Sequence, residues 1–589
     1  MVRALPMLKS LLADLSRRFL PARPAEPAAI AAQDAQRMLE GAVALWRARD
    51  YDGATQRCRE LIARDRHAGK ALELLGAIAL ERGSDEEAWR CFEAALEAGQ
   101  PTASMLANAA ETGRRTGRFV RAMALCDRAL SLQPNHGPAL HIRALTLESC
   151  WRTDEALAVL RQLVAAQPEF EEARSSYLFL LIHLGAESSL VKNEHIAWAR
   201  IHAEPPERTV EPFANERDSE RRLRVGYVSG DFCDHVSSHF ILAILQRHDA
   251  SRFEVFCYSS TKHLDETTAL LRRHAHHWRD IRRLNDDDAA SAIRADKIDI
   301  LVDLSGHTRA NRLRVFARRP APVQLTYLGY PATTGLSTMD YRITDAIADP
   351  PGKSELAYRE TLLRMPDSMW CFQPPEGMPE VGELPAAAGR VTFGSLNAML
   401  KLTPRMIAIW ARILHEIPGA RIALATIPQG EARTRLTEAF AANSIPASAL
   451  EFHERMPREE FWALHKRIDI ALDSFPCNGG ATTCETLWLG VPVVTLSSEV
   501  FQSRAGLSLL SCVGLPHLIA HSEDDYVRIA CELARNPSSL AQLRAGLRSR
   551  MLASPLMDLP KFMRALETHY RAIWHRWCDR CRPAYGSDH

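Results

Sequence analysis

A repeat of 34 residues in the first third of the chain constrains the fold more than any other feature. Four alanines stand 34 positions apart: Ala54, Ala88, Ala122 and Ala156. A small residue precedes each alanine by 12 positions (Ala42, Gly76, Ala110 and Ala144), and a larger one follows it by 4 (Cys58, Phe92, Cys126 and Leu160). Small residues let paired helices approach closely, and larger residues fill the gap between neighbouring pairs. A generic helical bundle would not keep this period through four copies, so the pattern predicts a helical solenoid.

The spacing and pattern resemble the tetratricopeptide repeat, a helix–turn–helix unit that stacks into a right-handed solenoid with a concave groove. Pro134 and Pro168, again 34 residues apart, fall where a loop is expected. We expect the repeats over residues 36–190, after an N-terminal helix or linker over residues 1–35. Solenoids of this kind usually hold polypeptides, so we expect the groove to bind a protein or peptide.

Composition excludes several classes of protein. The formal net charge of +1 on 589 residues gives no electrostatic reason to expect nucleic acid. No apolar run reaches the ~18 to 20 residues that span a bilayer, so no stable membrane insertion is expected. The 13 cysteines lack a disulfide-like spacing, which favours reduced thiols in a cytoplasmic protein. Cys578 and Cys581 form the one close pair, but two thiols supply only half of a zinc site, and we expect no metal there.

Residues beyond 222 alternate short β-rich runs with helical stretches, which indicates parallel α/β sheets. One series runs from "LRVGYVSGDF" to "YRITD", and a second runs from "VTFGSLNAML" to "VPVVTL". We predict two Rossmann-like domains, at residues 223–380 and at residues 381–589 with a C-terminal helix, joined to the repeats by a linking helix or junction over residues 191–222. Ligands of such sheets bind at the carboxyl ends of the strands, so we expect the functional site in the loops that follow them.

The stretch "PCNGGATTCETLWLG" follows one of these strands and leads into a helix. Gly479 and Gly480 would let the backbone approach phosphate oxygens, and free amides with the hydroxyls of Thr482 and Thr483 would donate to them. Glu485, one turn into the helix, has a carboxylate suited to ribose hydroxyls. A tight turn with ordinary threonine capping explains the stretch equally well. A nucleotide sugar would use all of these groups at once, whereas no Gly-Lys-Ser/Thr follows the glycines as in a P-loop.

Two other features bear on the charge of a departing diphosphate. Asp286–Asp288 stand at the start of a helix, where carboxylates satisfy free amides, so we interpret them as a solvated cap and not as a metal site. Lys401 follows a strand of the second domain and precedes a helix, which makes it the best candidate for a cation at the diphosphate.

The first domain offers an acid–base pair and a close-approach wall. Asp231 and His235 lie in the loop after the first strand, where His235 could take a proton from an attacking hydroxyl and Asp231 could orient the ring. His239 lies within the following helix, and we interpret it as a packing or capping residue. Gly329 and Pro331 in "TYLGYPATTG" are placed to form a wall against a sugar.

Four segments together resemble the O-linked N-acetylglucosamine transferases, specifically a bacterial homologue: "LRVGYVSGDFCDHVSSHF", "QLTYLGYPATTG" with "MDYRITD", "SLNAMLKLTP", and "LDSFPCNGGATTCETLWLGVPVVTL". That family joins tetratricopeptide repeats to a two-domain GT-B catalytic region, so the likeness covers nearly the whole chain. The resemblance implies metal-independent, inverting transfer of N-acetylglucosamine from UDP-GlcNAc to Ser or Thr hydroxyls of proteins.

The resemblance also implies roles for individual residues. His235, with Asp231 beside it, corresponds to a proposed base or substrate contact, and Lys401 to the lysine that stabilises the departing diphosphate. A further proposed base of the family lies in the linking helix, where His195 or His202 is available. The donor-binding set that we infer is Gly329, Pro331, Asn397, Met456, Cys477, Gly479, Gly480, Thr482, Thr483 and Glu485.

Departures from the family pattern leave alternatives. Animal members have His-Thr-Thr where this chain has Gly480, Ala481 and Thr482, and its Gly-Gly-x-Thr-Thr form also resembles the Spindly-type protein O-fucosyltransferases, which use GDP-fucose. The asparagine repeated in the family's groove is present only as Asn108. The alternatives are therefore a GDP-fucose-dependent protein O-fucosyltransferase, a nucleotide-binding repeat scaffold with little activity, or transfer to a small molecule or glycan.

Overall fold

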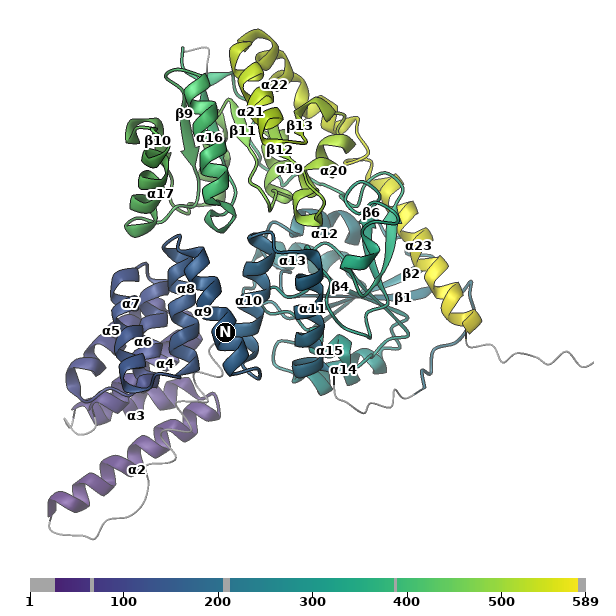
Figure 1. The fold of residues 1–589 in the computed structure, drawn as a ribbon. Coiled ribbons are helices and arrows are strands. Elements are labelled where there is room, and N and C mark those ends of the chain that lie inside the picture. Colours follow the sequence, from purple (N-terminus) through teal and green to yellow (C-terminus); the bar gives the residue numbers. More distant parts are fainter. Residues whose placement is uncertain (1–26, 64–67, 205–211, 386–388, 581–589) are drawn as a thin grey trace, which may run out of the picture. The chain divides into compact units, whose positions relative to one another are not determined.

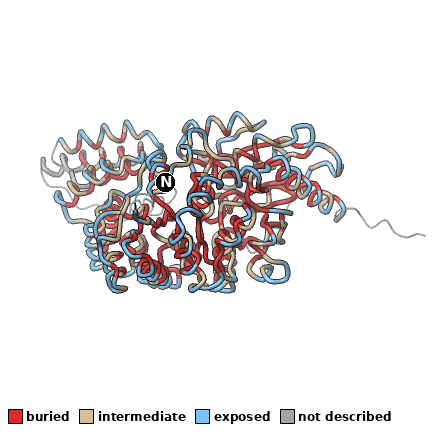
Figure 2. Tube along the Cα trace, turned by 90° about the horizontal axis from the view of Figure 1, so that it is seen from above, coloured by how far each residue is buried: buried red, intermediate tan, exposed pale blue. Residues whose placement is uncertain are grey.

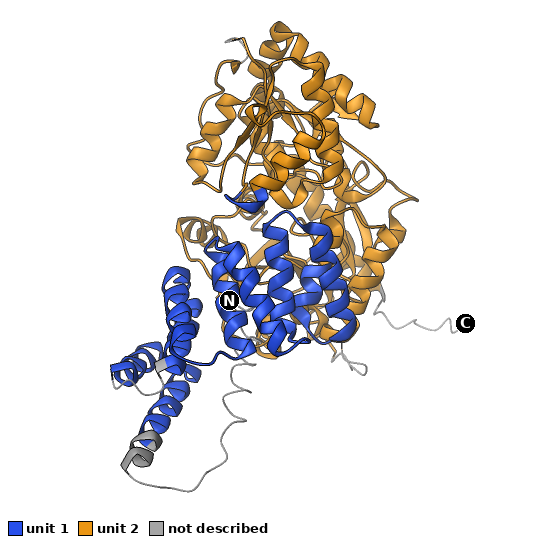
Figure 3. Ribbon diagram, turned by 60° about the vertical axis from the view of Figure 1, so that its left-hand side comes forward, with its two compact units in different colours: residues 1–177, 428–432 blue, residues 178–427, 433–589 orange. Residues whose placement is uncertain are grey.

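The computed structural model describes residues 27–63, 68–204, 212–385 and 389–580 (Figure 1). Most of the predicted N-terminal segment 1–35, and Cys581 of the cysteine pair, lie outside the described residues. The chain divides into two compact units, residues 1–177 with 428–432, and residues 178–427 with 433–589 (Figure 3). None of the described helices combines the length and apolar content needed to span a bilayer.

The first unit is a succession of antiparallel helix pairs. Four of its helices begin 34 residues apart, at Tyr51, Asp85, Phe119 and Thr153. The helices are α2 (Pro27–Arg47), α3 (Tyr51–Ala63), α4 (Ala68–Arg82), α5 (Asp85–Ala98), α6 (Ala103–Arg115), α7 (Phe119–Leu132), α8 (Gly137–Ser149), α9 (Thr153–Ala166) and the first part of α10 (Glu171–His183). The helical repeat that the sequence predicts is therefore confirmed.

Burial of the repeated positions explains the period. Ala54, Ala88, Ala122 and Ala156 are all fully buried, as are the larger residues four positions later. A Cβ added at Gly76 would lie 2.8 Å from the Phe92 ring, so the glycine makes room for the aromatic side chain of the next helix. In Figure 2 each repeat helix carries both buried and exposed residues, as amphipathic helices do.

The second unit contains a seven-stranded sheet in the order β3-β2-β1-β4-β5-β6-β7, in which every pair is parallel. Its strands are β1 (Leu223–Ser229), β2 (Phe253–Ser259), β3 (His277–Asp280), β4 (Ile300–Asp303), β5 (Val323–Thr326), β6 (Tyr341–Asp345) and β7 (Thr361–Met365). Its helices are α12 (Ser238–Leu245), α13 (Glu266–His274), α14 (Asp286–Ala295) and α15 (Leu313–Ala317). The strand order reverses direction between β1 and β4, where a doubly wound sheet opens its ligand crevice.

A six-stranded parallel sheet of the same unit has the order β10-β9-β8-β11-β12-β13. Its strands are β8 (Thr392–Ser395), β9 (Arg421–Leu424), β10 (Leu450–Phe452), β11 (Ile470–Leu472), β12 (Val493–Leu496) and β13 (Ile519–Ala520). Its helices are α16 (Pro404–Glu416), α17 (Glu431–Ala442), α18 (Arg458–Leu464), α19 (Ala481–Trp488), α20 (Ala505–Cys512), α21 (Glu523–Arg535) and α22 (Pro537–Leu552). Here the order reverses between β8 and β11, so the loops after these two strands meet.

The last helix, α23 (Leu559–Arg580), packs on the first sheet. It contacts β5, β7 and α12. Tyr570 Oη lies 3.1 Å from Tyr227 Oη of β1, and His248 Nδ1 lies 3.0 Å from Glu567 Oε1. The sequence places this helix with residues 381–589, whereas the structure returns the end of the chain to the first sheet.

Candidate functional site

The loops at the two points where strand order reverses carry most of the predicted site residues. Asp231 and His235 follow β1, and Asn397 and Lys401 follow β8. The loop after β11 leads to Gly479, Gly480 and the start of α19. The sequence interpretation thus assigned these residues to the strand ends where parallel sheets bind ligands.

Asp473, which the sequence interpretation did not include, organises the loop after β11. Its Oδ1 accepts hydrogen bonds from Gly479 N (2.8 Å), Ser474 N (2.9 Å) and Asn397 Nδ2 (2.9 Å). Its Oδ2 accepts one from Thr495 Oγ1 (2.8 Å). Burial raises the pKa of Asp473, and these donors oppose that shift by stabilising the carboxylate. The available sequence signal was its position at the end of the strand, in "IALDSFP".

Lys401 is held against the same loop. Its Nζ donates to the carbonyl oxygen of Asn478 at 2.6 Å, next to the first of the two glycines. The neighbouring Cys477 is buried, which raises the pKa of its thiol, and the Lys401 ammonium partly opposes that shift. A cation therefore stands beside the loop that precedes α19.

The two glycines fit tight surroundings at the N-terminus of α19. A Cβ at Gly479 would lie 2.6 Å from Thr483 Oγ1 and 2.9 Å from Asn397 Oδ1, so only glycine fits there. Gly480 is the N-cap and provides no side chain to the first amides of the helix. These amides, with the half-buried Thr482, form a cluster of donors suited to an anion.

Glu485 lies within α19 and faces α12, the helix that follows β1 of the first sheet. Its Oε1 lies 3.1 Å from Nε2 of His239 on α12, and both side chains are 5 % exposed. Nε2 of His239 has no hydrogen-bond partner among the described residues, so this contact is at ion-pair distance without hydrogen-bond geometry. His239, which the sequence interpretation left as a packing residue, thus borders the site.

His235 is oriented by its own helix start more than by Asp231. Its Nδ1 lies 2.8 Å from Ser237 Oγ and 3.9 Å from Asp231 Oδ2. Burial raises the pKa of Asp231, and the proximity of His235 opposes that shift. The His235 side chain is 45 % exposed, so it is open to a substrate.

Gly329 lies where its backbone passes directly over the end of β4. A Cβ there would collide with the carbonyl oxygen of Leu304, so only glycine fits. The next residue, Tyr330, is buried, and its hydroxyl lies 2.9 Å from His195 Nε2. Pro331 follows and is half-buried.

His195 is fully buried on α11 (Ser188–Trp198), with both ring nitrogens engaged. Nδ1 lies 2.6 Å from the Val191 carbonyl oxygen, which can only accept, so Nδ1 carries the proton and Nε2 accepts from Tyr330. Burial lowers the pKa of His195 to about 4. In this structure, His195 supports the wall around Gly329, and its nitrogens are not open to a substrate.

The remaining predicted features lie elsewhere. Met456 is half-buried in the loop between β10 and α18, and its place in the donor set stays a prediction. Asp286–Asp288 begin α14, where Asn285 caps the Asp288 amide and Arg318 pairs with Asp287 at 2.5 Å. Within the described ranges, no cluster of three or more His, Cys, Asp or Glu side chains could hold a metal ion.

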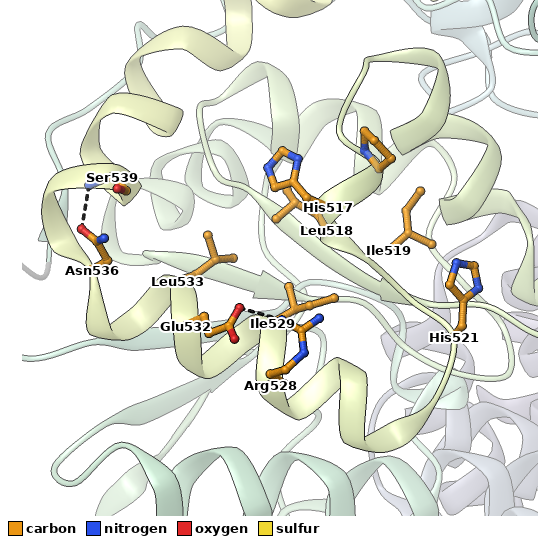
Figure 4. Close-up of a pocket in the computed structure, with 11 residues that line it drawn as sticks. His517, Leu518, Ile519, His521, Arg528, Ile529, Glu532, Leu533, Asn536 and Ser539 are labelled. Carbon is orange, nitrogen blue, oxygen red and sulfur yellow. Dashed lines mark hydrogen bonds and ion pairs between the residues drawn. The ribbon is translucent and has the colours of Figure 1, made fainter.

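A pocket of about 450 Å³ opens at the edge of the second sheet, between β13 and α21 (Figure 4). His517, His521 and Arg528 lie on its lining, and Arg528 pairs with Glu532 at 2.7 Å. None of the predicted site residues lines it. The pocket is therefore separate from the loops described above.

Comparison with known proteins identifies the family. The model of Glycosyl transferase family 41 matches residues 200–373 and 380–566. The chain belongs to this family. The family resemblance inferred from the sequence motifs is thereby confirmed.

The relatives agree with this assignment. A probable UDP-N-acetylglucosamine–peptide N-acetylglucosaminyltransferase SPINDLY of Petunia hybrida is 42 % identical over 374 residues, which cover 62 % of this chain and 40 % of that protein. The corresponding SEC protein of Arabidopsis thaliana is 31 % identical over 377 residues, covering 62 % of this chain and 38 % of that one. The family 41 chain thus matches about 40 % of the length of its curated relatives.

A solved structure, a mutant O-GlcNAc transferase of Thermobaculum terrenum, matches 88 % of this family 41 chain and 99 % of its own, with 31 % identity and a TM-score of 0.82. The fold predicted from the sequence, a helical repeat region followed by two α/β domains of the GT-B type, is confirmed by this match.

Proposed function

We propose that the chain is an inverting protein O-glycosyltransferase that moves N-acetylglucosamine from UDP-GlcNAc to Ser or Thr hydroxyls of proteins. One observation carries the proposal. Lys401, the start of α19 without a side-chain cap, and Glu485 all lie where the strand order of the second sheet reverses. The names of the relatives, which specify UDP-N-acetylglucosamine and a peptide, support this donor and acceptor.

In the proposed reaction, the acceptor oxygen attacks the anomeric carbon as the bond from that carbon to the diphosphate oxygen breaks. The hydroxyl proton goes to a base, and UDP leaves with the bonding electrons. Lys401 and the first amides of α19 stabilise the charge on the departing diphosphate, so the transfer needs no metal ion. Glu485 holds the ribose, and orientation of both substrates supplies much of the remaining rate enhancement.

His235 is the proposed base or substrate contact. Ser237 Oγ, 2.8 Å from Nδ1, can accept the Nδ1 proton, which leaves Nε2 to take the proton of the acceptor hydroxyl. Asp231, 3.9 Å away, stabilises the resulting imidazolium through space. We assign His195 a supporting role, because it fixes Tyr330 beside Gly329 and Pro331 on the sugar side of the site.

The organisation of the chain follows from the same proposal. Repeats over residues 36–190 present the protein acceptor in their groove, residues 191–222 link them to the catalytic region, and residues 223–380 and 381–589 form its two domains, with α23 returning to the first. Every cysteine among the described residues is a free thiol, which supports the cytoplasmic location that we propose.

Calorimetric titration with UDP, UDP-GlcNAc, GDP and GDP-fucose in the presence of a chelator tests the donor. We expect the uridine ligands to bind, and radiolabelled sugar to pass from UDP-GlcNAc to protein acceptors. Preference for the guanosine ligands would replace the proposal with fucose transfer. Binding without transfer to any acceptor protein would leave a nucleotide-binding scaffold, and binding of none of the four would refute the donor site.

A further inference from the structure

The loop that carries His235 is tied to the neighbouring helix of its own sheet. The backbone N–H of Asp234 donates to Asp265 Oδ2 (2.7 Å), and the hydroxyl of Thr268 donates to the carbonyl oxygen of Phe232 (2.8 Å). Asp265 and Thr268 form the capping box at the start of α13. The backbone on the N-terminal side of His235 is therefore held by the first sheet's own elements.

The side chain of Asp234 pairs with a residue of the second sheet's helices. Its Oδ1 lies 2.5 Å from Nη2 of Arg458, the first residue of α18. The guanidinium of Arg458 also lies 5.9 Å from the centroid of the Trp462 ring, and its side chain is only 25 % exposed. A partly shielded ion pair thus joins the loop after β1 to α18.

The helix α18 does not itself explain an arginine at this position. The N-terminus of a helix is the positive end of its dipole, so a cation in the first turn is unfavourable there. Glu459 and Glu460, in the same turn, supply the negative charges that favour a helix start. The contact with Asp234 therefore gives Arg458 a purpose that its own helix does not.

A second contact joins the two sheets' helices on the other side of His235 in the sequence. His239, four residues after His235, lies 3.1 Å from Glu485 of α19. Asp234, immediately before His235, pairs with α18. The residues on both sides of His235 are thus held against helices of the second sheet, and one of these, α19, begins at the loop beside Lys401.

We propose that Arg458 is a positioning residue for His235, which it holds in place by pairing with Asp234. The inference rests on the proposed function, which makes His235 the base or a substrate contact. Arg458 acts through Asp234 and sets the place of His235 relative to the donor loops of the second sheet. Because orientation of reacting groups contributes strongly to rate, loss of the pair should lower kcat and leave donor affinity unchanged.

Two single variants and their charge swap test this role. Asp234→Asn and Arg458→Gln each remove one charge, and Asp234→Arg/Arg458→Asp restores a pair of opposite charges with the partners exchanged. The control is Arg412→Gln, which removes an arginine that pairs with Asp524 at 2.6 Å, between α16 and α21. For each protein, kcat and KM with UDP-GlcNAc, the calorimetric Kd of UDP and amide hydrogen exchange in residues 231–238 would be measured.

We expect both single variants to lower kcat by about fivefold, with KM for UDP-GlcNAc and Kd for UDP unchanged. Amides of residues 231–238 should exchange faster in both. The charge swap should return kcat to within about twofold of wild type, and Arg412→Gln should match wild type throughout.

Wild-type kcat in Asp234→Asn, or a charge swap as slow as the single variants, would overturn the inference and leave the proposed function intact. Weaker UDP binding in Arg458→Gln but not in Asp234→Asn would make Arg458 a donor contact and would also overturn it. If wild type transferred no sugar, the proposed function would fail by itself. Hydrogen exchange would still decide whether the pair holds the loop, because unchanged exchange in both single variants would refute that.

Discussion

His239 Nε2 lies 3.1 Å from Glu485 Oε1, so a side chain of α12 faces a buried carboxylate of α19. The two helices follow β1 of one sheet and β11 of the other. A buried carboxylate is costly unless a partner balances its charge. The contact therefore links Glu485, our proposed ribose-binding residue, to the helix α12. The loop that leads into α12 carries His235.

Replacing His239 tests this coupling. His239→Phe keeps a ring of similar size but leaves Glu485 buried without its partner, and we expect it to destabilise the region around α19 by about 1–3 kcal/mol. Adding Glu485→Gln should recover most of this loss, because a neutral amide costs less to bury. Amide hydrogen exchange in α12 and α19 would report the opening free energies, with the exposed His263→Phe as the control. Equal protection in wild type and His239→Phe would show that the pair contributes nothing.

Lys401 should be essential for transfer and dispensable for folding. Its ammonium is half-buried and bonds a loop carbonyl oxygen. In Lys401→Ala the buried Asp473 loses a nearby positive charge but keeps its four hydrogen-bond donors, so we expect the loop to stay folded. Loss of a cation at the leaving diphosphate should lower kcat by at least about 100-fold. Steady-state transfer from UDP-GlcNAc would be compared with Lys561→Ala, which removes a lysine 50 % exposed and paired with Asp367. Full activity in Lys401→Ala would remove the lysine from the mechanism.

The sequence predicted those parts of the molecule that depend on local, periodic patterns. The 34-residue spacing of Ala54 and its equivalents predicted the helix pairs, because each repeat buries the same positions against its neighbour. Alternating apolar runs predicted both parallel sheets, and the rule that ligands bind at strand ends led to the loop containing Gly479.

Local patterns could not predict contacts between distant segments of the chain. Trp370 meets Gly480, and His239 meets Glu485, across more than 100 residues of sequence, and no periodicity links them. Asp473 escaped notice because aspartates also end β4 and β6, where Asp303 and Asp345 accept amides of their own loops. The order of the chain placed the helix α23 with the second sheet. In the structure its buried Tyr570 and Glu567 instead contact β1 of the first sheet and the loop after α12.

His195 should make stability depend on pH. Its pKa is about 4 in the folded protein and about 6.5 when unfolded, so the unfolded chain binds more protons between these values. The stabilisation is complete above pH 6.5 and is lost as the pH falls toward 4, by an amount on the order of 3 kcal/mol. Urea unfolding at several pH values would show a steeper dependence in wild type than in His195→Phe/Tyr330→Phe. Identical slopes would mean that His195 titrates normally in the folded protein.

Gly76 should be a packing requirement of the repeats. A Cβ there would lie 2.8–3.0 Å from three atoms of the fully buried Phe92 ring. Overpacking of this kind costs about 1–3 kcal/mol, which exceeds the gain of up to about 1 kcal/mol in helix propensity from glycine to alanine. Gly76→Ala should therefore lower amide protection in α4 and α5. Adding Phe92→Leu should restore part of it, because the smaller side chain leaves room for the methyl group.

The control for this variant is Gly99→Ala, because a Cβ at Gly99 would meet nothing within 4 Å and the backbone there is extended. We expect its protection to stay within about 0.5 kcal/mol of wild type. If Gly76→Ala also stayed within this range, the helices would have room to shift, and the small residue at this repeat position would not be required by the contact with Phe92. A loss confined to α4 and α5 would instead show that one methyl group suffices to disturb a repeat.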